Sequence, residues 1–126
     1  MSLGSVVVIE DDTEMRSMVT DHLKREGYQV KNFGSSLEAV KFLSSSDLEA
    51  LSTELVLTDL RMPELDGLDV LQQIRRLPHQ FPVVIMTAFA TVDTAIEGLR
   101  KGAFDYITKP FKLAELTLIV ERALAF

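Results

Sequence analysis

The chain has 126 residues, of which 47% are hydrophobic and 25% are charged, and it contains no cysteine. These proportions are typical of one soluble domain with a full core, and they leave no disulfide framework and no thiolate metal site. The formal net charge of −6 argues against direct binding of a nucleic-acid backbone by this segment. Without an apolar run of about twenty residues or a secretion leader, we expect a cytoplasmic protein with no membrane span.

The amino-terminal part of the chain reads as a strand, a helix and a second strand. The apolar run Val6–Ile9 predicts a buried strand that leads into the acids at 10–12. Asp12 or Thr13 can be the N-cap of the following helix, and for Asp12 we prefer this role to a part in the acidic site. Gln29–Phe33 predicts the next strand. The apolar stripe expected in this first helix, which should end before residue 27, consists of Met15, Met18, Val19 and Leu23.

The middle of the chain continues the alternation. Ser35, with Glu38 three residues later, predicts the start of a second helix, and the polar stretch 44–47 ends it. Leu55–Asp59 predicts a third strand that ends in an acid, and a third helix starts near Gly67. The residues expected to face the core are Ala39, Val40 and Leu43 in the second helix, and Leu68, Leu71 and Ile74 in the third.

Two further units complete the chain. Val83–Met86 predicts a fourth strand, followed by a helix that closes at Gly102, and Tyr106–Thr108 predicts a fifth strand. The last helix should run from Leu113 to about Phe126. The apolar stripe of the fourth helix is Val92, Ala95, Ile96 and Leu99, and that of the last helix is Leu113, Leu116, Val120, Ala123 and Leu124. Ala114, Leu118 and Ala125 point to the other side of the last helix, as a partner-docking face or as ordinary surface residues.

Alternating strands and helices are typical of an α/β protein with a parallel sheet. In such a sheet the carboxyl ends of the strands share one edge, where ligands bind. The residues that follow the strands, Glu10, Asp11, Asp59, Thr87 and Lys109, should therefore meet although they are far apart in sequence.

The chemistry of these residues suits phosphoryl transfer. Three clustered acids repel one another unless a cation neutralises them, and Mg²⁺ prefers a few carboxylate oxygens together with water and phosphate oxygens. Lys109 would supply a second positive charge, and Asp59 could attack phosphorus to form an acyl phosphate. The Thr87 hydroxyl and the Ala88 N–H could hydrogen-bond a phosphoryl oxygen.

These residues resemble the receiver domains of two-component response regulators over nearly the whole chain. The matching motifs are the acidic pair Glu10-Asp11, the segment 59–67, the pair Thr87-Ala88, and Tyr106 three residues before Lys109-Pro110-Phe111. The resemblance implies a flavodoxin-like (βα)5 doubly wound fold with a five-stranded parallel sheet in the order 2-1-3-4-5. The acidic pair is Glu-Asp where Asp-Asp is commoner, a variant that occurs within the family.

The resemblance also implies a role for each site residue. Asp11 and the phosphoacceptor Asp59 would bind Mg²⁺ directly, the backbone carbonyl of Arg61 would be the third protein ligand, and Glu10 would act through water. The Lys109-Pro110 peptide is expected to be cis. The phosphoryl donor would be a phosphohistidine of a sensor histidine kinase.

Phosphorylation is expected to change the surface of the domain. It should draw Thr87 toward the phosphoryl group and let the Tyr106 ring turn inward, which alters the face made by the fourth helix, fifth strand and fifth helix. This face is expected to serve a homodimer or an inter-domain contact.

The segments 87–95 and 102–111 look like the receivers of bacterial enhancer-binding transcription activators, which implies a transcriptional output domain outside this chain. We interpret 5–126 as a single receiver domain and 1–4 as a vector remnant or a disordered N-terminus.

Two other interpretations use the same residues. Haloacid-dehalogenase-like phosphatases also combine a strand-end aspartate, Mg²⁺ and a lysine, but they need a second acid two residues after the nucleophile, where this chain has Arg61. A degenerate receiver that only binds partners would lack an acid, Thr87 or Lys109, and none is missing. We therefore expect a phosphoacceptor rather than an enzyme, with slow dephosphorylation because Arg61 and Phe89 flank the approach of water.

Overall fold

The computed structural model describes residues 2–88 and 92–125. The strands are β1 (Ser5–Ile9), β2 (Gln29–Phe33), β3 (Leu55–Asp59), β4 (Val83–Thr87) and β5 (Asp105–Thr108). The helices are α1 (Thr13–Arg25), α2 (Ser36–Leu43), α3 (Leu48–Leu51), α4 (Gly67–Ile74), α5 (Val92–Arg100) and α6 (Leu113–Ala125). All strand pairs are parallel, and the order is β2-β1-β3-β4-β5, which confirms the predicted sheet.

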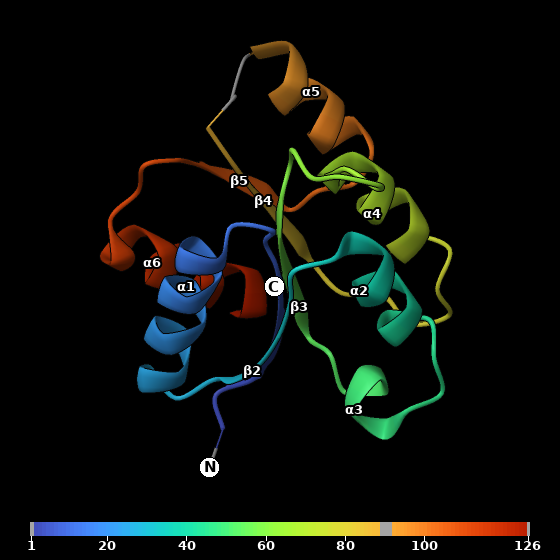
Figure 1. Ribbon diagram of the computed structural model, residues 1–126, viewed down its shortest axis with the longest axis horizontal. Helices are drawn as coiled ribbons and strands as arrows, with labels where there is room; N and C mark the ends of the chain where they lie inside the picture. The colour runs from blue at the N-terminus through green and yellow to red at the C-terminus, as the bar shows by residue number, and fades with distance from the viewer. Residues whose placement is uncertain (1, 89–91, 126) are drawn as a thin grey trace.

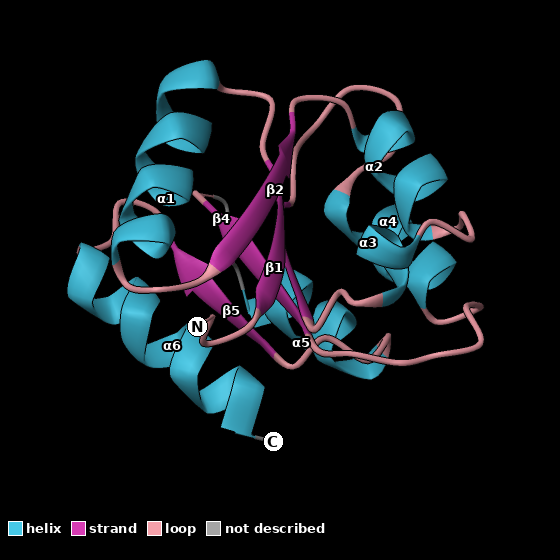
Figure 2. Ribbon diagram, turned by 90° about the horizontal axis from the view of Figure 1, so that it is seen from below, coloured by secondary structure: helices cyan, strands magenta, loops and turns pink. Residues whose placement is uncertain are grey.

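Helices cover both faces of this sheet. In Figure 1, α1 and α6 lie on one face, while α2, α4 and α5 lie on the other. Figure 2 shows the same two layers from below, with the short α3 on the same side as α2. The arrangement is a three-layer doubly wound fold, whose ligand edge lies at the carboxyl ends of the strands.

The apolar runs of the central strands are continuous because the strands are buried on both faces. In β1, Val6 and Val8 belong to the core under α1 and α6, whereas Val7 and Ile9 belong to the core under α2 and α4. Every residue of β3 and β4 is buried. Such strands carry no polar alternation, as expected for a parallel sheet covered twice.

The register of the strands decides which residues meet at the ligand edge. Ile9 pairs with Thr58, so the residue after β1 comes beside Asp59 at the end of β3. On the other side, Asp59 pairs with Met86, and Thr87 pairs with Thr108. The last residues of the five parallel strands therefore lie along the same edge of the sheet.

The helix starts follow from local capping. Asp12 caps α1 by accepting a hydrogen bond from Glu14 N, as predicted, and the Ser35 hydroxyl caps α2 by accepting one from Glu38 N. Before α4, Asp66 and Asp69 form a reciprocal capping box. The cap at Asp12 comes directly after Asp11, and the cap at Asp66 ends the loop that follows Asp59.

The fold differs from the prediction in one element. The prediction had five helices, and the structure adds a sixth, α3, between α2 and β3, with Asp47 as its N-cap. A helix of four residues is too short to show an apolar period, so only the cap residue could have announced it.

Three apolar side chains assigned to core-facing stripes are more exposed than predicted. Met18 is 39% exposed, Ile96 is 43% exposed and Leu99 is 51% exposed. Among the α5 residues whose burial is described, Gly98 is buried, and an added Cβ there would lie 3.4 Å from Ile85 Cδ1. The small residue brings the helix backbone close to the sheet, and the neighbouring large side chains lie at the margin of this contact.

The amino-terminal residues described by the structure contact the sheet edge. Leu3 N donates to the carbonyl oxygen of Gly27, and Gln29 N donates to that of Gly4. No helix among the described residues is long and apolar enough to cross a lipid bilayer.

Candidate functional site

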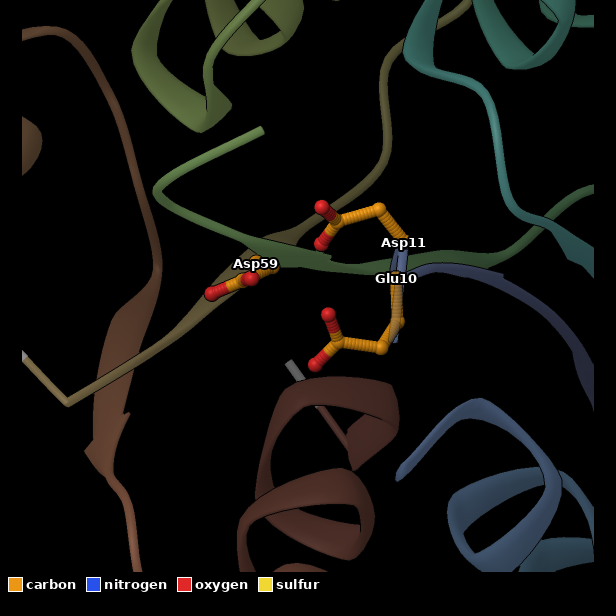
Figure 3. Close-up of side chains that lie close together, drawn as sticks. All are labelled: Glu10, Asp11 and Asp59. Atoms are coloured by element: carbon orange, nitrogen blue, oxygen red, sulfur yellow. The ribbon is translucent and has the colours of Figure 1, made fainter. Parts of the chain in front are cut away.

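Three carboxylates converge at the carboxyl edge of the sheet (Figure 3). Glu10 and Asp11 follow β1, and Asp59 ends β3; one carboxylate oxygen from each lies within 4.8 Å of the others. Glu10 is fully buried and Asp59 nearly so, whereas Asp11 is exposed. The cluster is therefore open to solvent on the side of Asp11.

Lys109 supplies the positive charge opposite these acids. Its Nζ lies 2.5 Å from Oε1 of Glu10 and 3.3 Å from Oδ1 of Asp59. Its backbone N–H donates to the carbonyl oxygen of Thr87, and the Lys109-Pro110 peptide is cis. The ammonium group thus lies between two carboxylates, in a position fixed by the pairing of β4 with β5.

The burial of these charges changes their proton affinities. Burial raises the pKa of Glu10 from an ordinary value of 4.5 to about 7; the hydrogen bond from Lys109 lowers it in part, and the Asp59 carboxylate raises it further. Burial lowers the pKa of Lys109, but the hydrogen bond and charge of Glu10, together with the Asp59 charge, outweigh this effect and raise it. Lys109 is therefore a fixed cation at neutral pH.

The loop after Asp59 is folded tightly against the end of β3. Leu60 N donates to Asp59 Oδ1 at 2.9 Å, and Gly67 N donates to the Leu60 carbonyl oxygen at 2.8 Å. Glycine is required at position 67 because an added Cβ would lie 2.5 Å from the Asp59 carbonyl oxygen. Arg61, the predicted carbonyl ligand, lies in this loop beside the acids.

The predicted switch residues lie on β4 and β5. Thr87 is buried, Ala88 is exposed, and Tyr106 is 37% exposed. Thr87 and Tyr106 line one hollow between β4, α5 and β5, together with Leu60, Ile85 and Leu99. With a volume of about 10 Å³, this hollow has room for about one water molecule and not for a ring.

A positioning contact of Arg16 was missed by the sequence analysis. Arg16 of α1 donates from Nη1 to the carbonyl oxygen of Glu10 at 2.9 Å. Its guanidinium lies over Gly34, where an added Cβ would come 2.5 Å from Nη1. Arg16 is the fourth residue of α1, and Gly34 directly follows β2. Nothing in the sequence links these two positions until the fold is known. Phe89, which was predicted to flank the path of water, lies outside the described residues.

The donor set of the cluster suits a hard divalent cation. Its three carboxylates offer oxygen ligands only, and two of them are buried. Lys109 supplies one positive charge against these acids, so a divalent cation would neutralise the charge that remains. Glu10, Asp11 and Asp59 could therefore hold a metal ion at this edge.

Comparison with known proteins agrees with this fold. The family model described as the response regulator receiver domain matches residues 6–121. The chain therefore belongs to the family of response regulator receiver domains.

Its curated relatives include longer regulators of transcription. The chain is 37% identical to the regulatory protein AtoC of Escherichia coli (strain K12), over 98% of this chain and 26% of that protein. It is 38% identical to the DNA-binding transcriptional regulator NtrC of a Bradyrhizobium species, over 99% of this chain and 25% of the relative. The chain thus spans about a quarter of the length of these relatives.

Solved structures give the same result. A response regulator receiver domain protein from Clostridium thermocellum has a TM-score of 0.88 and 28% identity, with 98% of this chain and 95% of that chain covered. NtrX from Brucella abortus has a TM-score of 0.86 and 30% identity, with 99% of this chain and 27% of that chain covered.

Proposed function

We propose that this chain is a cytoplasmic, phosphorylation-controlled switch in which Asp59 accepts a phosphoryl group from a phosphohistidine of a sensor histidine kinase, with Mg²⁺ as cofactor. The observation that carries the proposal is the position of Lys109 Nζ, between the carboxylates of Glu10 and Asp59. A strand-end aspartate with an acidic cluster on one side and a fixed ammonium on the other is arranged to attack an anionic donor.

The transfer exchanges one bond to phosphorus for another. An oxygen of the Asp59 carboxylate forms the new P–O bond while the P–N bond to the donor histidine breaks. The histidine nitrogen keeps the electron pair, and the protein gains an acyl phosphate. Lys109 then binds a phosphoryl oxygen, and the Thr87 hydroxyl and the Ala88 N–H donate hydrogen bonds to the others.

Asp11, Asp59 and the carbonyl oxygen of Arg61 would hold Mg²⁺, and Glu10 would act on it through water. When bound, the ion neutralises charge between the Asp59 carboxylate and the phosphoryl oxygens. The position two residues after Asp59 is occupied by Arg61, so the chain lacks the acid that would drive rapid turnover. The chain thus assists its own phosphorylation and slow dephosphorylation without being a turnover enzyme.

Intact mass spectrometry tests the proposal. After incubation with Mg²⁺ and acetyl phosphate, the parent protein should gain one phosphoryl group, and Asp59→Asn should gain none. Chelation of the metal should abolish the gain. An unchanged parent mass, or equal modification of Asp59→Asn, would contradict the assignment, and a phosphatase would release phosphate without a persistent adduct.

We also propose that the phosphoryl group is sensed by Thr87 and Tyr106. In this structure the hollow beside Thr87 has room for about one water molecule, and Tyr106 is partly exposed. Movement of Thr87 toward the phosphoryl group would enlarge this hollow so that the ring can enter, which changes the face made by α5, β5 and α6. If Thr87→Ala is phosphorylated normally and its NMR spectrum shows the full change on this face, the coupling is wrong.

The domain organisation completes the proposal. Residues 5–126 would act as one receiver domain, and the face of α5, β5 and α6 would contact a second copy or an output domain. Support for a transcriptional output comes from relatives about four times as long, among them several NtrC proteins named as DNA-binding transcriptional regulators.

A further inference from the structure

Ser36, the first residue of α2, makes a two-sided contact with the loop that follows the phosphoacceptor. Its hydroxyl donates to the carbonyl oxygen of Pro63 at 3.1 Å and accepts from the backbone N–H of Leu65 at 3.1 Å. The side chain is 1% exposed, so no solvent competes for these bonds. One buried hydroxyl thus spans the two peptide groups on either side of Glu64.

The bridged residue has an unusual backbone conformation. Glu64 has a φ of 70°, in the left-handed region, and is the one described residue other than glycine with a positive φ. For an L-residue with a long side chain this conformation is unfavourable and needs support from its surroundings. The Ser36 hydroxyl supplies that support, because it binds the carbonyl group before Glu64 and the N–H group after it.

The position of this turn affects the metal-binding edge. The loop is closed at its base by the hydrogen bond from Gly67 N to the Leu60 carbonyl oxygen. Its far side is held at Pro63 by Ser36, so only residues 61 and 62 lie between two fixed points. The carbonyl of Arg61 lies in this short span, and its direction follows from where Pro63 is held.

We propose that Ser36 is a positioning residue for the phosphorylation site: by holding the turn at Glu64 it sets the direction of the Arg61 carbonyl toward the cation. This role rests on the proposed function and deepens it. Met62 and Leu65 also pack against the core under α2 and α4, and the experiment must separate this packing from the hydroxyl.

Ser36→Ala removes only the hydroxyl. Loss of a buried bridging hydroxyl should weaken Mg²⁺ binding about 3- to 10-fold, the change expected for one hydrogen bond. Calorimetric titration with MgCl₂ measures this without a phosphoryl donor. Ser36→Cys fills the site with a thiol, which is slightly larger than the hydroxyl and a weaker hydrogen-bonding group. It should also weaken Mg²⁺ binding, and it provides the test if Ser36→Ala does not fold.

The neighbouring Ser35→Ala is the matched control. It removes the cap of α2, where Ser35 accepts from Glu38 N, and the long hydrogen bond from the Ser35 hydroxyl to Glu64 Oε1 at 3.4 Å. It leaves both bonds of Ser36 to the backbone of the loop, so it separates these backbone contacts from the side-chain contact of Glu64. It should lower the stability of the protein while Mg²⁺ affinity stays at the parent value. Equal losses of affinity in Ser35→Ala and Ser36→Ala would show that Ser36 acts only through stability, and the inference would be overturned.

Two further measurements separate positioning from general damage. In the metal-free protein, amide hydrogen exchange at Leu65 should accelerate in Ser36→Ala and not in Ser35→Ala. The second change Glu64→Asn, placed in Ser36→Ala, should restore part of the Mg²⁺ affinity because asparagine tolerates the left-handed region. Absence of any rescue together with unchanged Leu65 exchange would refute the role of the turn.

The outcome also distinguishes this inference from the proposed function. If the parent takes up no phosphoryl group, the function fails, whereas the Leu65 exchange still reports whether Ser36 holds the turn. If the parent is phosphorylated and Ser36→Ala matches it in both affinity and rate, only the inference fails.

Discussion

At the scale of single residues, the site is built at the expense of stability. Glu10 is fully buried beside Asp59, and its pKa is raised to about 7, by burial first and by its neighbour second. Ionised Glu10 is therefore unfavourable in the folded protein without a metal. Residues that bind a cation are commonly a source of instability when the cation is absent.

A pH-dependent stability follows for the metal-free protein. The folded state keeps a proton on Glu10 up to about pH 7, whereas the unfolded chain releases it near pH 4.5, so the free energy of unfolding should fall as pH rises through this window. The contribution is at most about 3 kcal/mol. Urea unfolding at pH 5 and pH 8 with a chelator measures it, and Glu10→Gln should remove most of the difference. The same pH dependence in both proteins would contradict the prediction.

Two glycines make a matched pair with opposite expectations. Gly67→Ala puts a Cβ 2.5 Å from the Asp59 carbonyl oxygen, so it should destabilise the fold by about 1–3 kcal/mol and slow phosphorylation. In Gly98→Ala, which lies in α5, the added Cβ makes only ordinary contacts with Ile85 and Leu68. This variant should stabilise the fold by about 0.5–1 kcal/mol because alanine favours a helix over glycine. Denaturation of both variants measures the two effects. Equal effects would show that the close approach at Gly67 is relieved by backbone movement.

The site could be predicted from sequence only in part. Strand-end chemistry pointed to Glu10, Asp11 and Asp59, because a parallel sheet gathers its strand ends, and the structure brings them together. Ser36 and Arg16 carry no such pattern. The Ser36 bonds reach across 27 and 29 residues to backbone atoms, which no local sequence period encodes.

At the scale of elements, the bounds of the strands were predicted to within one residue at each end. Polar residues on both sides of an apolar run leave little choice of where the strand begins and ends. β2 and β3 matched the prediction, while β1, β4 and β5 each gained one residue. Helix faces were less predictable. In α5 the residue described as buried is Gly98, which a hydrophobic stripe cannot reveal.

The outward face of α6 should bind a partner. Leu118 is 56% exposed. Together with Tyr106, Ile119 and Arg122 it lines a surface groove. If this face forms a dimer on phosphorylation, sedimentation with beryllofluoride as a phosphoryl mimic should show a dimer that Leu118→Glu abolishes. Leu48→Glu, on the distant α3, changes a side chain that is 82% exposed and should have no effect. A monomer in every state would leave only the contact with an output domain.

At the scale of the whole molecule, cation binding and folding are linked. A ligand that binds only the folded state stabilises it by mass action, so Mg²⁺ at about 100 times its dissociation constant should add about 2.7 kcal/mol to the free energy of unfolding. Asp11→Asn should lose most of this gain, while its metal-free form should be at least as stable as the parent because one repulsive charge is gone. Thermal unfolding with MgCl₂ or chelator tests both; an equal gain in Asp11→Asn would place the cation elsewhere.

The ion pair between Lys109 and Glu10 joins residues 99 positions apart in the chain. Asp59 leaves the ribosome long before Lys109 does, because β5 is the last strand in the chain. A growing chain, or a fragment that stops before β5, therefore carries the aspartate without the ammonium group that the proposed transfer requires. If the proposal holds, we expect such a fragment to take up phosphoryl groups more slowly than the complete domain.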